Sequence, residues 1–296
     1  MKCLIIGACG FIGNELTKYA RVKGHTVLGC DVLPWEGKVQ LQFPDNDDYL
    51  CVADAEPDND FLIKADSMVI LAGKRPYKDF SYEDFKLNLD IANKYINLAI
   101  ENGIPNIVFA SSKAVYSGND LPWSEDSINS PSSLYGASKS AVEQLGLYYC
   151  LKGNTRFVSL RFAQVIGLGE RKGYLINTLI DNAIEKKQQV VYGDGSQYRH
   201  YVYVKDVCEA VLKASASRTN GVYNIGMQKT VSNLELAEAV NRAFGNEGNL
   251  FLDKSKKMDL INDEMDVGKA ELDLDFRAGF DVYEAMSDIA KSIRNE

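Results

Sequence analysis

The chain has 296 residues, of which 46% are hydrophobic and 25% are charged, and it contains 23 glycines and only 7 prolines. This composition is that of an ordinary folded protein, and it excludes disordered, collagen-like and low-complexity classes. The 33 lysines and arginines against 41 aspartates and glutamates give a net charge of -8, so there is no general basic field to attract nucleic acid or an anionic membrane. We therefore expect no nucleic-acid partner and no membrane partner, and a phosphate-bearing ligand must be met by local groups.

The cysteines and histidines do not form a metal-binding pattern. The six cysteines are scattered without a CxxC pair, and His25 and His200 are the only histidines, so no metal site is expected. Cysteines used in this way are typical of reduced thiols in the cytoplasm. The apolar run near the N-terminus is interrupted by Gly7, and no stretch approaches the roughly 18 apolar residues of a membrane span. We expect a cytoplasmic protein without a signal peptide.

The predicted elements alternate between strands and helices. An apolar run at 2–7 is typical of a buried parallel strand, and residues 11–23 then show helical spacing of apolar side chains. Further strands are predicted at 25–30, 38–43, 67–72, 106–111 and 156–161, and helices at 82–102, 134–151 and 175–187. This alternation predicts an α/β fold, with a Rossmann-type doubly wound parallel sheet covered by helices on both faces. After about residue 166 the connections become rich in glycine and charge, which indicates a smaller second domain.

A glycine-rich loop joins the first predicted strand to the first predicted helix. Gly7, Gly10 and Gly13 form a GxxGxxG pattern in the strand-to-helix context that gives such a pattern meaning. Gly7 would allow a tight turn, Gly10 the close approach of a pyrophosphate, and Gly13 the packing of helix on strand, with the helix N-terminus facing the anion. The alternative is that the three glycines serve only a tight turn.

Asp31 ends the second predicted strand, 18 residues after Gly13 (31 − 13). A carboxylate about 20 residues beyond the glycines accepts the adenosine ribose hydroxyls and repels a 2′-phosphate. Residues 32–34 supply no arginine or lysine that could receive that phosphate. The sequence therefore favours NAD over NADP as cofactor; the alternative is that Asp31 only begins a loop.

A tyrosine and a lysine stand four residues apart near the start of a predicted helix. Tyr135 and Lys139 at this spacing share one helix face. Tyrosine has a pKa of about 10, so it is a base near neutral pH only if positive charge from Lys139 and an oxidised nicotinamide stabilises the phenolate. Ser112 follows a predicted strand and could hydrogen-bond the substrate oxygen that Tyr135 deprotonates. The alternative places Tyr135 in the core and Lys139 on a solvated face.

Taken in this order, these features resemble the extended short-chain dehydrogenase/reductase superfamily, in its NAD-dependent nucleotide-sugar epimerase/dehydratase family (UDP-glucose 4-epimerase-like). The motifs are GACGFIG at 7–13, SSKAVYS at 111–117, YGASK at 135–139, LRFAQVIG at 160–167 and YGDGSQYRHYVYVKDVCEA at 192–210. The resemblance implies an NAD-binding Rossmann domain at 1–166, with 200–226 contributing to it. It also implies a smaller C-terminal substrate-binding domain at 167–296, with the active site between the two.

The resemblance also implies a role for each matching position. The implied catalytic residues are Ser112, Tyr135 and Lys139. The implied cofactor-binding residues are Gly7, Gly10, Phe11, Ile12, Gly13, Asp31, Asp54, Leu71, Ala72, Gly73, Asn88, Tyr135, Lys139 and Ala163. The implied substrate-binding residues are Ser112, Gln164 and Arg199, with the glutamine facing the sugar and the arginine on its diphosphate, which suits the fork of a guanidinium.

Some positions depart from the family pattern. His200 stands where the family usually has aspartate, and a hydrogen-bonded structural histidine is favoured there over a catalytic one. Lys256 or Lys257 lies where a second phosphate-binding arginine is often found; a solvated charge cluster is an equal alternative. The 4,6-dehydratases carry an Asp-Glu pair where this chain has Lys113 and Ala114, so dehydration is disfavoured, as are the glutamate-bearing decarboxylases.

Three functions are consistent with these residues. We favour an NAD-dependent nucleotide-sugar epimerase, most simply a 4-epimerase, which forms a transient keto-sugar. The second is an NAD(P)-dependent reductase or dehydrogenase of a keto-sugar or another hydroxyl substrate, and the third is a non-catalytic dinucleotide-sensing protein. A homodimer is expected through the helices at 82–102 and 134–151; the alternative is that their apolar residues only cover the sheet. The nucleotide, the sugar and the inverted carbon stay open.

Overall fold

The computed structural model describes residues 1–32, 49–51, 65–76, 79–118, 120–151, 153–255 and 262–294. Within these residues a seven-stranded sheet runs in the order β11-β6-β5-β4-β1-β2-β3, and every neighbouring pair is parallel. Its strands are β1 (Lys2–Ile6), β2 (Thr26–Asp31), β3 (Tyr49–Cys51), β4 (Ser67–Ile70), β5 (Asn106–Ser112), β6 (Arg156–Phe162) and β11 (Gly221–Ile225). The predicted α/β fold with a Rossmann-type parallel sheet is confirmed.

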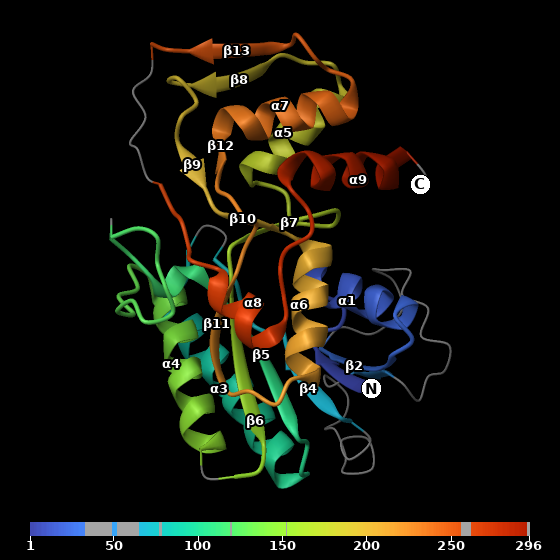
Figure 1. Ribbon diagram of the computed structural model, residues 1–296, viewed down its shortest axis with the longest axis vertical. Helices are drawn as coiled ribbons and strands as arrows, with labels where there is room; N and C mark the ends of the chain where they lie inside the picture. The colour runs from blue at the N-terminus through green and yellow to red at the C-terminus, as the bar shows by residue number, and fades with distance from the viewer. Residues whose placement is uncertain are drawn as a thin grey trace.

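Helices cover both faces of the sheet (Figure 1). One face carries α1 (Phe11–Val22) and α6 (Val204–Ala216), and the other carries α3 (Tyr82–Glu101) and α4 (Leu134–Cys150). Successive side chains of β1 alternate between the two layers: Ile5 joins the apolar cluster of Leu16, whereas Leu4 joins the cluster of Ile96. All four side chains are fully buried. A strand buried on both sides reads as a continuous apolar run, which explains why 2–7 was recognisable in the sequence.

The strand order reverses at β1. This strand pairs with β2 on one side and with β4 on the other, so the connections that leave β1 and β4 diverge at the carboxyl edge of the sheet. In open α/β sheets, ligands bind in the crevice at such a switch point. We therefore expect the ligand-binding site among the residues that follow β1, β4, β5 and β6.

A smaller group of elements lies beyond this edge, towards the top of Figure 1. It consists of α5 (Leu175–Ile184), β8 (Gln189–Tyr192), β9 (Tyr198–Arg199), β12 (Val231–Ser232), α7 (Asn233–Phe244), β13 (Leu250–Asp253) and α9 (Val282–Arg294). The chain passes between the two groups more than once. It returns to the sheet through β10 (Tyr201–Tyr203), α6 and β11, and later through α8 (Gly268–Leu274), which packs on β11.

The observed ends of several elements differ from the predicted ones. The strand predicted at 38–43 lies outside the described residues, and the strand beside β2 is β3. The helix predicted at 175–187 ends at Ile184, because Lys186 adopts a left-handed backbone (φ 57°) that cannot continue a helix. The strand predicted at 106–111 extends to Ser112, so this serine is the last residue of β5. None of the helices in the described ranges is long and apolar enough to cross a membrane.

Candidate active site

A cavity of about 790 Å3 opens at the carboxyl edge of the sheet. Its walls come from the loop after β1, the residues after β4, the turn after β5, the start of α4 and the connection from β6 to β7 (Gln164–Ile166). It is lined by most of the predicted site residues, namely Gly7, Gly10, Phe11, Ile12, Gly13, Leu71, Gly73, Ser112, Tyr135, Lys139, Ala163 and Gln164. Most of the residues predicted for the cofactor, and two of the three predicted for the substrate, therefore share one cavity.

The loop after β1 fits a dinucleotide pyrophosphate. Gly7 has a φ of 92°, and a Cβ there would lie 2.8 Å from the backbone nitrogen of Ala72. A Cβ at Gly13 would lie 2.1 Å from the Gly7 oxygen, so only glycine lets α1 begin this close to β1. Gly10 is the N-cap of α1, and it has no side chain to occupy the amide groups of the first turn. A helix N-terminus open to a cavity in this way is suited to an anion.

Asp31 stands at the adenosine end of this loop. It is the last residue of β2, and its Oδ2 accepts a hydrogen bond from the backbone nitrogen of Cys9 at 2.9 Å. This bond ties the glycine-rich loop to β2 and puts a carboxylate where a ribose hydroxyl would be bound and a 2′-phosphate repelled. Asp31 does not line the cavity itself. Asp54 and residues 33–34 lie outside the described residues.

The residues after β4 form the floor of the cavity. A Cβ at Gly73 would lie 3.2 Å from Asn88 Oδ1 and 4.0 Å from Lys139 Nζ. Asn88, on α3, accepts from the backbone nitrogen of Lys74 at 2.7 Å and donates to its carbonyl at 3.0 Å. Asn88 therefore supports the floor from behind. Neither Asn88 nor Ala72 lines the cavity.

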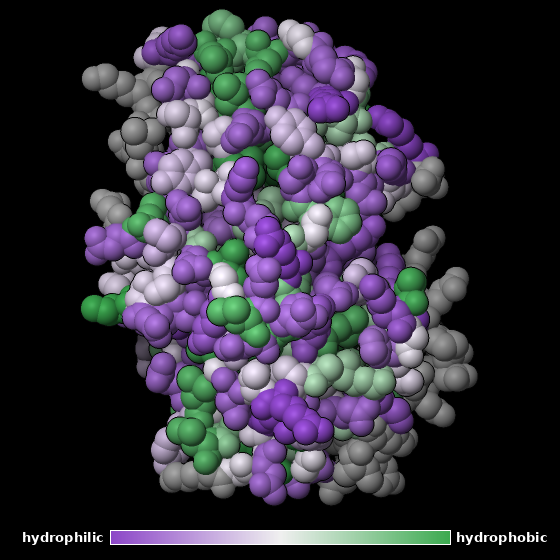
Figure 2. All heavy atoms as spheres, viewed as in Figure 1, coloured by the Kyte–Doolittle hydropathy of each residue, from purple (hydrophilic) through white to green (hydrophobic). Residues whose placement is uncertain are grey.

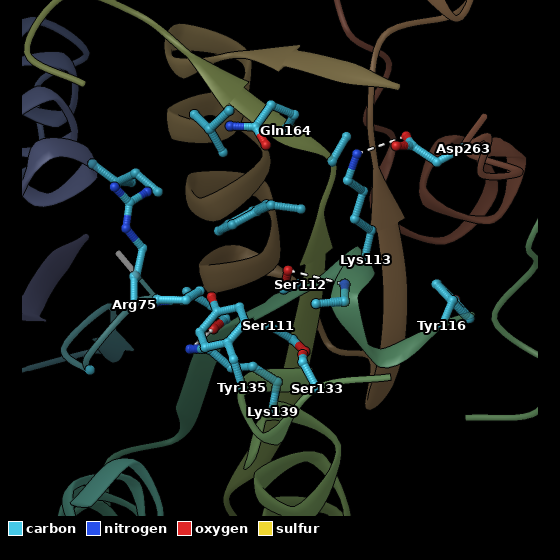
Figure 3. Close-up of a pocket in the computed structure, with 18 of the residues that line it drawn as sticks. Arg75, Ser111, Ser112, Lys113, Tyr116, Ser133, Tyr135, Lys139, Gln164 and Asp263 are labelled. Carbon is cyan, nitrogen blue, oxygen red and sulfur yellow. Dashed lines mark hydrogen bonds and ion pairs between the residues drawn. The ribbon is translucent and has the colours of Figure 1, made fainter. Parts of the chain in front are cut away.

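The three predicted catalytic residues meet at the end of β5 (Figure 3). Ser133 caps α4 by accepting from the backbone nitrogen of Gly136 at 3.1 Å, which puts Tyr135 in the first turn. Lys139 Nζ donates to the Ala110 carbonyl at 2.7 Å and lies 5.7 Å from the centre of the Tyr135 ring. The Ser112 hydroxyl accepts from the backbone nitrogen of Ala114 at 3.2 Å, and Ser112 and Tyr135 line the same cavity.

A glycine in the YGASK motif brings these residues together. A Cβ at Gly136 would lie 1.9 Å from the Ala114 carbonyl oxygen, so glycine lets α4 rest directly on the turn that follows β5. Ser112 precedes that turn and Tyr135 precedes Gly136. The close packing of the two backbones therefore sets the approach of the serine to the tyrosine.

Burial and neighbouring charges shift the pKa values of Lys139 and Tyr135. Burial lowers the pKa of Lys139 to about 8, which the carboxylate of Glu143 opposes and the guanidinium of Arg75 reinforces. Burial raises the pKa of Tyr135, and the charge of Arg75 and the side chain of Ser112 act against it. Tyr135 is therefore a phenol at neutral pH, and it needs further positive charge nearby to become a base.

The cavity also holds charged residues that sequence reasoning missed. Arg75 follows β4, lines the cavity, and donates from NH2 to Oε1 of the buried Glu170 at 2.7 Å. Lys113 donates from Nζ to Asp263 Oδ1 at 2.7 Å, and both of these residues line the cavity. Basic residues directly after predicted strands were the available signal for Arg75 and Lys113. No local signal existed for Asp263.

The substrate residues are divided between two places. Gln164, at the start of β7, lines the cavity, whereas Arg199 does not. Its guanidinium NH1 lies 3.9 Å from Oδ2 of the cavity residue Asp263, and its side chain is 40% exposed. His200 is buried between Met265, whose backbone nitrogen donates to Nδ1 at 2.9 Å, and Met227, whose carbonyl lies 2.7 Å from Nε2. These contacts match the structural role predicted for His200.

Lys256 and Lys257 lie outside the described residues. All six cysteines belong to the described residues and carry free thiols. Over the same residues, no group of three or more histidine, cysteine, aspartate or glutamate side chains could hold a metal ion.

Known proteins resemble this chain over almost its whole length. Residues 3–226 match the sequence model of the NAD dependent epimerase/dehydratase family. The chain is 28% identical to a putative UDP-glucose 4-epimerase of Methanocaldococcus jannaschii, over 99% of this chain and 98% of that protein. It is 28% identical to a UDP-N-acetyl-alpha-D-glucosaminuronate decarboxylase of Bacillus cytotoxicus, over 81% of this chain and 79% of that protein.

Solved structures show the same similarity. The UDP-N-acetylglucosamine 4-epimerase from Bacillus cereus superposes with a TM-score of 0.85 at 27% identity, covering 100% of this chain and 97% of that one. MoeE5, solved with UDP-glucuronic acid and NAD, superposes with a TM-score of 0.82 at 27% identity, covering 100% of this chain and 99% of that one.

Proposed function

Because the chain belongs to the NAD dependent epimerase/dehydratase family, it is an NAD-dependent enzyme, and we propose that it epimerises a nucleotide-diphosphate sugar through a transient keto-sugar. The observation that carries this proposal is the meeting of Ser112, Tyr135 and Lys139 in one cavity with the glycine-rich loop. Relatives of 27–28% identity that span nearly the whole chain and are named 4-epimerases support it. We take 4-epimerisation as the simplest form.

The cavity residues divide the work of this reaction. The loop after β1 and Gly73 would hold NAD, which would supply reversible hydride transfer at the sugar carbon. Tyr135 takes the proton from the sugar hydroxyl, and Ser112 holds the same oxygen. Lys139, fixed on the Ala110 carbonyl, supplies positive charge next to the tyrosine. Positioning and proton transfer then carry the chemistry without a covalent intermediate.

The residues that follow Ser112 favour epimerisation over elimination. The residues after Ser112 are Lys113 and Ala114, which cannot serve as the acid and base of a dehydratase. Asp263 is the acidic residue among the described lining residues. Its Oδ1 already accepts from Lys113 and from the backbone nitrogen of His200, both at 2.7 Å, so two donors occupy this oxygen.

A substrate panel tests the proposal. Purified protein and NAD are incubated with UDP-, GDP-, CDP- and dTDP-sugars, with products followed by proton NMR and NADH by absorbance. We expect a stereoisomer to appear without net NADH. A net change in NADH with substrate would instead indicate a reductase or dehydrogenase, and NAD binding without turnover of any sugar would favour a dinucleotide-sensing protein.

Tyr135→Phe is the matched variant for this assay. It removes only the hydroxyl, and we expect turnover to fall by at least about 100-fold, the usual contribution of general acid–base catalysis. NAD binding, measured by calorimetry, should stay within about twofold of the parent, because the loop after β1 is untouched. Near-parental turnover in this variant would remove the tyrosine from the mechanism.

We further propose that the sheet and its helices form the NAD-binding domain, from 1–166 with 200–226, and that 167–296 mainly bind the nucleotide sugar. A cytoplasmic enzyme is consistent with six free thiols.

A homodimer through α3 and α4 is supported by apolar side chains that these helices expose, namely Tyr82, Leu87, Leu134 and Tyr148, with Leu151 directly after α4. In Figure 2 apolar side chains gather over α4, at the lower left, and also at the top of the face, over β8 and β13.

A further inference from the structure

The Lys113–Asp263 ion pair stands in the wall of the cavity, and no step of the proposed reaction uses it. The side chains are only 16% and 7% exposed, and 150 residues separate them in the chain. Figure 3 shows the ammonium and the carboxylate facing each other across from Tyr135. Lys113 directly follows Ser112 in the chain, and Ser112, Lys113 and Asp263 all line the cavity, so the pair is open to a sugar bound there.

Asp263 is fixed in position from several sides. Its Oδ1 accepts from the backbone nitrogen of His200 at 2.7 Å in addition to Lys113. The ring of His200 is in turn held by Met227 and Met265. Arg199 approaches the other oxygen, Oδ2, at 3.9 Å. The carboxylate therefore cannot swing towards a ligand, and it keeps the ammonium of Lys113 in place.

The pair offers both donors and an acceptor to the cavity. An ammonium has three N–H groups, and Lys113 uses one of them on Asp263 among the described residues. Among the described residues, Oδ2 of Asp263 makes only the long contact with Arg199. A hydroxyl needs a donor for its oxygen and an acceptor for its proton, so Lys113 and Asp263 can satisfy a sugar hydroxyl in both ways.

Charge balance distinguishes a neutral sugar from an acidic one. Lys113 and Asp263 neutralise each other at 2.7 Å. Arg199 adds one positive charge at the edge, which suits a diphosphate. A carboxylate on the sugar would meet an ammonium that is already compensated and would be repelled by Asp263, whereas a hydroxyl meets no such penalty.

We propose that Lys113 and Asp263 act as a specificity pair that binds a hydroxyl of the sugar ring and selects a nucleotide sugar with a neutral sugar over one with a uronic acid. This inference rests on the proposed function, because it concerns the sugar end of the same cavity. It assigns a positive role to the residue that replaces the dehydratase carboxylate.

Matched pairs of nucleotide sugars test the selection. UDP-glucose and UDP-glucuronic acid form one pair, and UDP-N-acetylglucosamine and its uronic acid form another. Binding is measured by calorimetry at pH 7 on the NAD-loaded Tyr135→Phe protein, and turnover on the parent. We expect the neutral member to bind at least about tenfold more tightly, the size of one hydrogen bond to a charged group.

Three variants separate the effect of the charge from the effect of the side-chain shape. Asp263→Asn keeps an oxygen for the His200 amide and frees the Lys113 charge, so the preference for the neutral sugar should fall by about tenfold. Lys113→Met should raise KM for the neutral sugar by about tenfold while NAD binding stays unchanged, and Lys113→Arg should restore part of it. Lys86→Met, at an exposed position on α3, is the control for the loss of a lysine.

The outcomes distinguish the inference from the function on which it rests. If neutral sugars bind and turn over, but the preference is the same in the parent, in Asp263→Asn and in Lys113→Met, the specificity pair is wrong and the epimerase stands. If the parent prefers the uronic acid, the inference is also wrong. If no nucleotide sugar of any pair binds the NAD-loaded protein, the proposed function fails together with the inference.

Discussion

In the proposed mechanism, Lys139 carries the charge on which the base function of Tyr135 depends. Burial lowers its pKa to about 8, so the ammonium is fully present below about pH 7 and is lost as the pH rises through about 8. We expect kcat/KM to fall over that range, because the phenolate loses its stabilising charge. The pH profile measures this directly. A profile that stays flat from pH 7 to about pH 9.5 would contradict this expectation. Ser112→Ala should lower kcat/KM without changing the pH at which kcat/KM falls.

The residues of the site differ in how far the sequence could predict them. Tyr135 and Lys139 were recognisable because four residues make one helical turn, which is a local property. Asp263 was not, because its contact with Lys113 spans 150 residues and depends on how the whole chain folds back. Arg199, which is predicted to bind the diphosphate, does not line the cavity, and its guanidinium NH1 lies 3.9 Å from Oδ2 of the lining residue Asp263.

At the level of elements, α4 is held on the sheet by a buried ion pair. Glu143 accepts from NH2 of Arg161 at 2.7 Å and from the hydroxyl of Ser111 at 2.5 Å, and all three residues are buried. Glu143→Ala would leave the Arg161 charge buried without its partner, so we expect a loss of about 3–5 kcal/mol of unfolding free energy. Urea unfolding followed by circular dichroism measures the change.

The exposed pair on α3 supplies the control for that experiment. Lys86 and Asp90 lie 3.7 Å apart with side chains 70% and 64% exposed. Asp90→Ala should therefore cost no more than about 1 kcal/mol. Equal losses in Asp90→Ala and Glu143→Ala would show that burial of the Glu143 pair does not govern its contribution.

Long amphipathic helices and buried strands were predictable because their periodicity is local. The helices at 82–102 and 134–151 were placed within one residue at each end. The short strands β7, β8 and β10 have four residues or fewer, and each pairs with a strand far along the chain. Their own residues therefore contain no periodic pattern that predicts a strand. The positive φ of Lys186, which ends α5, carries no signal either, because lysine rarely adopts it.

At the scale of the whole molecule, the sequence predicted the fold, the family and the NAD dependence, and the structure and its relatives confirm them. The path of the chain between the two groups of elements was harder to predict. β11 joins the sheet by pairing with β6, and α8 packs on β11 although it follows the smaller group. These contacts depend on tertiary packing. The sequences at 221–225 and 268–274 therefore contain no local pattern from which the contacts could be predicted.

The exposed apolar residues of α4 lead to a prediction about assembly. Leu134 is 43% exposed and Leu151 82% exposed, at opposite ends of the helix. If α3 and α4 pair between two copies, charges at both ends would be buried without partners, so Leu134→Glu with Leu151→Glu should dissociate the dimer. Sedimentation should then report a mass near 32.9 kDa for the variant and twice that mass for the parent. Leu272→Glu, at an 86% exposed position on α8, changes a leucine of similar exposure outside the proposed interface and should leave the parent mass unchanged. A parent that sediments as a monomer at micromolar concentration would mean that these leucines form no interface between copies and only belong to the helical layer that covers the sheet.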